Sequence, residues 1–167
     1  MKKKYFTINS LKSKGTKVKE SPQNKKLEEM LKSSKLVAGG FMGDDTRSIT
    51  EIIDSDISDI TRSGYSTEQI AERMREITNK AVLFLGNWSE IDQKRLAKVE
   101  EAKGSLVCPW PHSGRFAKRV TTVKMIETGQ IIKYSDLNIH LIEEHGFFEG
   151  RGSTFRLEPK KLIKIIF

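Results

Sequence analysis

The chain has 167 residues, enough for one domain of ordinary size. Hydrophobic residues make up 37% of it, and no apolar run approaches the ~18–20 residues that span a bilayer, so the composition excludes a membrane-spanning helix and predicts a soluble protein. No apolar segment follows the lysine run at Lys2–Lys4, which argues against a secretory signal, and a single cysteine excludes an internal disulfide. These features predict a cytoplasmic protein.

The formal net charge of +8 resides in the first 35 residues. These hold eleven lysines and three glutamates, whereas residues 36–167 hold 19 basic and 19 acidic residues. We therefore predict a flexible lysine-rich tail over residues 1–35, with at most a helical turn near 25–31, before a single globular domain over residues 36–167. Such a tail could contact nucleic acid, the ribosome or an acidic partner, or it could simply remain solvated.

Two capping boxes predict helices. The first, Ser48–Glu51, precedes isoleucines at helical spacing (positions 49, 52, 53, 57 and 60), and Gly64 suits the end of that helix. The second, Ser66–Gln69, precedes an apolar stripe that continues to Gly86. We expect the two helices to form an antiparallel pair.

The sequence beyond the helical pair predicts a small antiparallel sheet. Residues 91–103 carry mixed signals, and we place a strand from about Lys98. Residues 119–127 and 130–134 flank a Thr-Gly turn and predict a hairpin. A further helix is expected over residues 137–144, and Pro159 is placed to begin a last helix or turn. The fold class is therefore predicted to be α+β.

The chemistry-bearing residues lie close together in the sequence. The only cysteine and all three histidines are Cys108, His112, His140 and His145. Both pairs have the spacing of structural zinc ligands, so one hypothesis is a zinc ion held by all four. Five helical steps of about 100° would separate His140 and His145 by about 140°, which predicts that both bind only if His145 leaves the helix.

Two other interpretations of these residues remain open. In the first, the four residues have separate structural roles: Cys108 is a small buried hydrophobic residue, and each histidine interacts with groups close to it in the chain. Alternatively, Cys108 could be the nucleophile of an enzyme that acts on a phosphorylated or acyl substrate, with a histidine as its base.

A glycine-rich segment, residues 146–156, suggests an anion pocket. Arg151, Ser153 and Arg156 in this segment, together with Arg115, could bind an anionic ligand, because glycines let backbone N–H groups approach an oxyanion. A tight turn anchored by phenylalanines explains the same residues. The best functional prediction is a small binding domain with a zinc or anion site within residues 104–156.

Three segments together carry a family resemblance: Cys108-Pro-Trp-Pro-His112, the run Asp136-Leu-Asn-Ile-His-Leu-Ile, and His145-Gly-Phe-Phe-Glu-Gly-Arg-Gly-Ser. From about Phe41 to its end, the chain resembles a group of small bacterial cytosolic proteins with no assigned activity. The resemblance implies a cytoplasmic α+β domain and transfers no catalytic residue.

Overall fold

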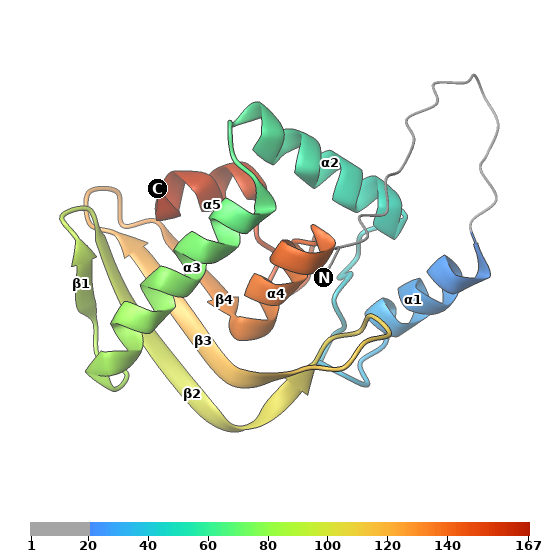
Figure 1. The fold of residues 1–167 in the computed structure, drawn as a ribbon, viewed down its shortest axis with the longest axis horizontal. Helices are drawn as coiled ribbons and strands as arrows, with labels where there is room; N and C mark the ends of the chain where they lie inside the picture. The colour runs from blue at the N-terminus through green and yellow to red at the C-terminus, as the bar shows by residue number, and fades with distance from the viewer. Residues whose placement is uncertain (1–20) are drawn as a thin grey trace, which may run out of the picture.

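The computed structural model describes residues 21–167 and confirms the α+β class (Figure 1). Its elements, in chain order, are α1 (Pro22–Lys32), α2 (Ile49–Arg62), α3 (Thr67–Ala81), a 3-10 turn (Val82–Phe84), β1 (Ser89–Asp92), β2 (Arg95–Val107), β3 (Arg115–Met125), β4 (Ile131–Ser135), α4 (Asp136–His145) and α5 (Pro159–Ile166). The four strands pair antiparallel in the order β1-β2-β3-β4.

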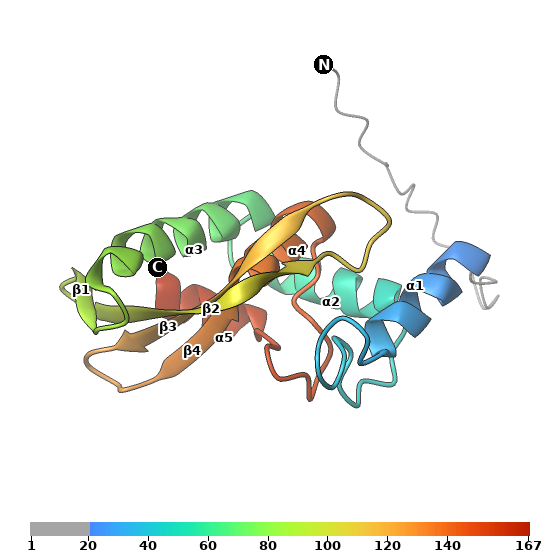
Figure 2. The ribbon, with the colours of Figure 1, turned by 90° about the horizontal axis from the view of Figure 1, so that it is seen from below.

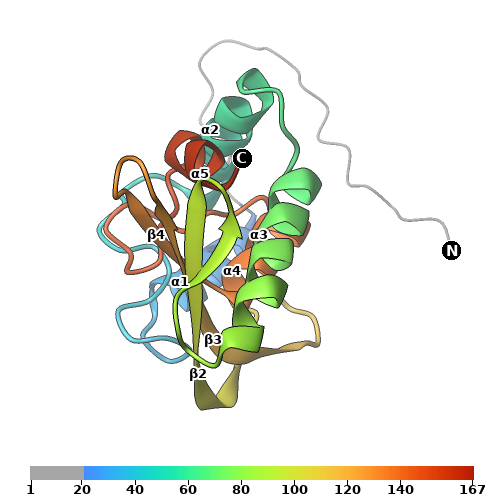
Figure 3. The ribbon, with the colours of Figure 1, turned by 90° about the vertical axis from the view of Figure 1, so that its left-hand side faces the viewer.

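The main core lies between the sheet and the helices. Alternate residues of β2, such as Ala97 and Val99, are buried against α3, which runs along one side of the sheet (Figure 3). Two buried hydrogen bonds join α3 to the sheet: Tyr134 Oη donates to the carbonyl of Met74 at 2.9 Å, and the hydroxyls of Thr78 and Thr121 meet at 2.7 Å. The C-terminal helix α5 completes this core.

The elements differ in detail from the sequence predictions. Helix α3 packs mainly on α4 and β2, whereas α2 packs mainly on α5. The two helices that were predicted to form a pair are therefore consecutive in the chain, but each packs mainly on other elements. Strand β2 begins at Arg95 rather than Lys98, and residues 89–92 form a strand of their own. Arg95 is buried because its guanidinium donates to the Ile165 carbonyl at 2.6 Å, a partner 70 residues away.

Helix α1 replaces part of the predicted flexible tail. Ser21 caps it, Pro22 occupies its first turn, and Leu31 near its end is fully buried. Glu28 accepts a hydrogen bond at 2.7 Å from the backbone N–H of Ile49, the first residue of α2. Residues 22–32 therefore belong to the folded part, because they supply both a core residue and a helix cap. Residues 1–20 of the predicted tail lie outside the described residues.

Two glycine-rich segments, residues 37–43 and 146–156, pack directly on each other. Figure 2 shows the connection between α1 and α2 beside the connection between α4 and α5. The backbone N–H of Gly150 donates to the Phe41 carbonyl at 2.8 Å, and that of Asp44 donates to the Arg151 carbonyl at 3.1 Å. A Cβ atom at Gly43 would collide with the backbone of residues 151–153. The glycines are therefore required for this backbone contact.

Substituting Gly43 by alanine is expected to destabilise the protein more than the same change at Gly129. Both glycines have positive φ (57° and 67°), so both substitutions carry a similar left-handed backbone cost of about 1–2 kcal/mol. Only Gly43 has backbone atoms in the space of the new Cβ, which adds about 1–3 kcal/mol of overpacking. Urea unfolding of both variants measures the difference, and equal losses would show that the two loops are not in close contact.

Candidate metal centre

The long hairpin of β2 and β3 carries two of the four chemistry-bearing residues. A register shift between Ala102 and Ser105, with Gly104 at a φ of 102°, marks an irregularity in β2 where the hairpin passes beyond the main core. We call its distal part, residues 100–118, the arm. Its tip turns through Cys108–His112, where the backbone N–H of His112 donates to the Trp110 carbonyl at 2.8 Å.

Helix α4 carries the other two residues. Ser135 and Asn138 form a capping box at its start, and Gly146 ends it in the left-handed conformation. His140 lies in the middle of the helix, and His145 is its last residue.

The structure brings all four residues together. The Cys108 Sγ lies 3.4 Å from Nε2 of His145, and His112 Nε2 lies 3.1 Å from His145 Nε2 and 3.2 Å from His140 Nε2. All four potential ligand atoms lie within 4.8 Å of one another, so the group could hold a metal ion. Four residues spread over two separate elements therefore converge on one point.

His145 reaches this point without leaving the helix, contrary to the sequence prediction. Five residues rise about 7.5 Å along a helix, yet the ring centroids of His140 and His145 are only 5.2 Å apart. The prediction considered only the angle around the axis and neglected the length of the two imidazole side chains, whose rings approach each other.

The ring of His112 is oriented by the backbone. Its Nδ1 lies 3.0 Å from the carbonyl oxygen of Ser113, which can only accept, so in the neutral ring the proton belongs on Nδ1 and the lone pair on Nε2. That single lone pair faces Nε2 of both His140 and His145. One lone pair cannot accept two well-aligned hydrogen bonds, whereas a cation between the rings would bind one lone pair from each.

Burial disfavours charge on these side chains. It lowers the pKa of His145 to about 4, with the neighbouring histidines adding to the effect, and it also lowers the pKa of His140. Burial raises the pKa of the Cys108 thiol to about 11, although the Trp110 backbone N–H opposes the shift. Neutral imidazoles are the form that binds metals, and a cation would be needed to deprotonate the thiol.

Aromatic rings surround the cluster. Trp110 stacks on His145 at 4.1 Å between centroids, and Phe116 lies 4.4 Å from His140. Cys108 and Phe147 belong to a second apolar cluster, separate from the main core; its buried members are Leu31, Phe41, Met42, Ile49, Ile52, Cys108, Leu137, Leu141 and Phe147. The arm is therefore attached to the rest of the domain by this small cluster and by the Cys/His group.

The arrangement does not favour the nucleophile interpretation. Cys108 and His145 have the contact that a nucleophile and its base require. However, the thiol is only 7% exposed and its raised pKa leaves little thiolate at neutral pH.

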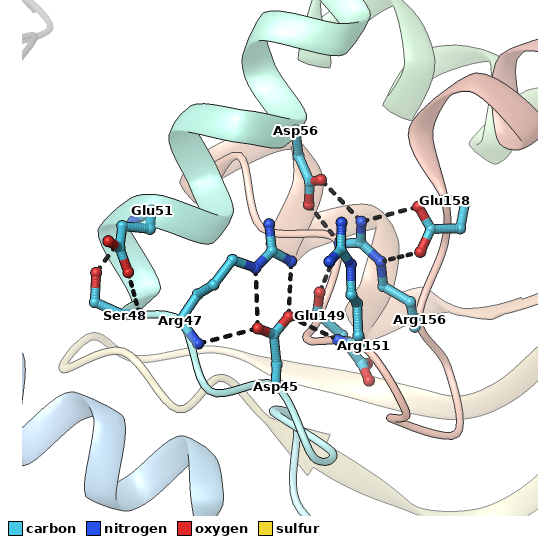
Figure 4. Close-up of polar contacts among 9 residues, drawn as sticks. All are labelled: Asp45, Arg47, Ser48, Glu51, Asp56, Glu149, Arg151, Arg156 and Glu158. Atoms are coloured by element: carbon cyan, nitrogen blue, oxygen red, sulfur yellow. Dashed lines mark hydrogen bonds and ion pairs between the residues drawn. The ribbon is translucent and has the colours of Figure 1, made fainter.

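The residues proposed for an anion pocket are mostly engaged within the protein, and Figure 4 shows the contacts of Arg151 and Arg156. Arg156 donates to both carboxylate oxygens of Asp56, to the Glu149 carbonyl at 2.7 Å and to Glu158 at 3.1 Å. The hydroxyl of Ser153 donates to the Glu149 carboxylate. Sequence reasoning could not find the main partner of Arg156, because Asp56 lies 100 residues earlier in the chain.

The other two candidates, Arg151 and Arg115, donate no side-chain hydrogen bond to this network. The backbone N–H of Arg151 donates to Asp45 at 3.0 Å, while its side chain is exposed. Arg115 lies on β3, where its guanidinium donates to Ser105 on β2 at 3.3 Å. This arrangement favours the tight-turn interpretation of residues 146–156.

Glu149 is a functional-site candidate that sequence reasoning missed. It is 4% exposed and has a left-handed backbone (φ 65°), which is unusual for a residue other than glycine. Asn138 Nδ2 donates to its carboxylate at 2.7 Å. Burial nevertheless raises the pKa of Glu149 to about 6, against the effect of the hydrogen bonds from Ser153 and Asn138.

We expect Glu149 to make stability fall as pH rises. The native state holds this proton up to about pH 6, whereas the unfolded chain releases it near its ordinary pKa of 4.5. Unfolding therefore releases a proton between these values, and the free energy of unfolding should fall by about 2 kcal/mol across the window. His145 acts in the opposite direction over an overlapping pH range. Its pKa is lowered to about 4, so its titration makes the free energy of unfolding rise with pH.

The effect of Glu149 is therefore measured as the difference in free energy of unfolding between the wild type and a Glu149 variant. Urea unfolding of the wild type and of Glu149→Gln from pH 4 to pH 8 should give curves that diverge between about pH 4.5 and 6 and run parallel above it. His145 contributes equally to both proteins and cancels. Parallel curves throughout would show that Glu149 titrates normally.

Comparison with known proteins does not assign the chain to a family. No family model, no curated protein and no solved structure matches the chain. The family resemblance noted in the sequence therefore stays a prediction. Within residues 21–167, no helix combines the length and the apolar character needed to cross a bilayer.

Proposed function

We propose that the chain is a small cytoplasmic zinc-binding domain, in which Cys108, His112, His140 and His145 hold one ion that fastens the arm to α4. The observation that carries this proposal is the convergence of the four potential ligand atoms to within 4.8 Å of one another. A single cysteine also suits a reducing compartment, where a thiol stays available for a metal.

The spacing of the donor atoms supports zinc. Zinc–nitrogen bonds of about 2.0–2.1 Å and a zinc–sulfur bond of about 2.3 Å at tetrahedral angles separate nitrogens by about 3.3 Å, and sulfur from nitrogen by about 3.6 Å. Three of the six donor pairs, at 3.1, 3.2 and 3.4 Å, are close to these edges, and the other three lie within 4.8 Å. Thiolate and imidazole together are a donor set that zinc accepts readily.

The environment supports a structural centre rather than a catalytic one. Four protein donors complete a tetrahedron and leave no position for water or substrate. The Ser113 carbonyl orients His112, as backbone carbonyls commonly do for metal-binding histidines. An ion here would join the tip of the arm to the last turns of α4, two segments separated by 27 residues of sequence.

Zinc analysis of the full-length protein tests the proposal. Protein purified without a histidine tag should contain about one zinc per chain, and Cys108→Ser or His145→Ala should contain less than about a tenth of that after dialysis against a weak chelator. Ser113→Ala is the matched control, because this residue adjoins His112 and contributes only its backbone carbonyl.

Cobalt substitution tests the donor set. Cobalt in the site should show the visible bands of tetrahedral geometry and a sulfur charge-transfer band that disappears in Cys108→Ser. Substoichiometric zinc in both the wild type and Ser113→Ala, with no cobalt spectrum, would contradict the proposal.

A further inference from the structure

A cavity lies at the base of the arm, where three segments meet. It has a volume of about 440 Å³ and lies between residues 36–41, the arm, and residues 149–155. Its walls are largely apolar and include Leu36, Val37, Phe41, Leu106, Val120 and Leu137. Ligand pockets in proteins typically enclose about 300–1,000 Å³, so this cavity has the size of a small-molecule site.

The charges around the cavity restrict what it can bind. Arg119 lines it, but its guanidinium is held by Asp136 at 2.6 Å. Glu149 lines it too, but its carboxylate already accepts from Asn138 and Ser153. Lys118 also lines the cavity, is exposed, and pairs with no carboxylate of residues 21–167. The one charge free to meet a ligand is therefore positive.

We propose that this cavity binds a small amphipathic monocarboxylate, with its apolar body against the walls and its carboxylate at Lys118. The apolar lining matches a hydrocarbon chain or ring, and the unpaired ammonium matches a single anionic head. The hydrogen-bonded contact between residues 40–44 and 150–153 adjoins one wall of the cavity, so that wall is formed before any ligand binds. None of the four Cys/His residues lines this cavity.

Calorimetric titration of the full-length protein with hexanoate, octanoate and decanoate, below their micelle concentrations, tests the apolar part. Affinity should rise about fourfold for each added methylene until the cavity is full. Val120→Trp, which fills the cavity, should abolish saturable binding while circular dichroism shows an unchanged fold. No saturable binding of decanoate, or affinity independent of chain length, would overturn the proposal.

Matched primary alcohols test the charged part. Lys118→Met should weaken decanoate binding about fivefold, the upper range for an exposed ion pair, and leave decanol binding unchanged. Lys133→Met is the control, because Lys133 is also an exposed lysine of the sheet but does not line this cavity. Equal effects of the two lysine variants, or equal effects of Lys118→Met on acid and alcohol, would refute the assigned role of Lys118.

Discussion

Removing the zinc ion proposed for the Cys/His group is expected to lower the melting temperature of the full-length protein by about 8–16 °C. When free zinc exceeds its dissociation constant a thousandfold, a single site stabilises the folded state by about 4 kcal/mol. A domain of this size loses about 2–4 °C of melting temperature per kcal/mol. The loss has a structural basis, because chelation would leave Nε2 of His112 facing two other imidazole nitrogens that it cannot satisfy together.

Single-ligand variants identify the origin of the effect. His112→Ala should melt near the chelated wild type and show no further response to chelator, since both treatments empty the same site. Hydrogen exchange should quicken in the arm and in the last turn of α4, and much less in the α3–sheet core, which has its own apolar cluster. An unchanged melting temperature after zinc removal would show that the ion does not stabilise the fold.

Replacing Arg156 by alanine is expected to cost about 3–5 kcal/mol, and hence about 6–20 °C of melting temperature. The side chains of Arg156 and Asp56 are only 7% and 3% exposed, so the substitution leaves an uncompensated carboxylate in the interior. Although burial opposes its charge, the hydrogen bonds that Arg156 donates to Asp56 and Glu158 raise its pKa, so it stays charged throughout the accessible pH range.

Two further variants separate charge burial from loss of contacts. The pair Asp56→Leu with Arg156→Met should recover most of the loss, because it removes both buried charges and fills similar volume. Arg62→Ala should cost at most about 0.5 kcal/mol, since its ion pair with Asp59 is exposed. A cost for Arg156→Ala as small as that for Arg62→Ala would contradict a structural role for the buried pair.

Local sequence signals predicted most of the secondary structure. The capping boxes at Ser48 and Ser66 begin α2 and α3 as expected, because their hydrogen bonds involve residues only three positions apart. The hairpin around Gly129 and the helix before Gly146 were also found from local patterns. The convergence of Cys108 with the histidines was suggested by the two short ligand-pair spacings.

The remaining features depend on contacts between distant residues. Arg95 lies in the stretch with mixed signals, residues 91–103, and the Ile165 carbonyl of α5 to which it donates belongs to a residue 70 positions away. Arg156 looked like an anion ligand, because nothing in its neighbourhood indicates Asp56 as a partner. Leu31 lay in a lysine-rich stretch whose average composition concealed one core residue.

X-ray absorption at the zinc edge tests the central claim most directly. For tag-free protein as purified, a zinc centre of Cys108, His112, His140 and His145 predicts about one sulfur near 2.3 Å and about three imidazole nitrogens near 2.0–2.1 Å, with the sulfur lost in Cys108→Ser. A first shell of light atoms alone, unchanged in Cys108→Ser, would show that the ion binds elsewhere and that these four side chains do not form its site.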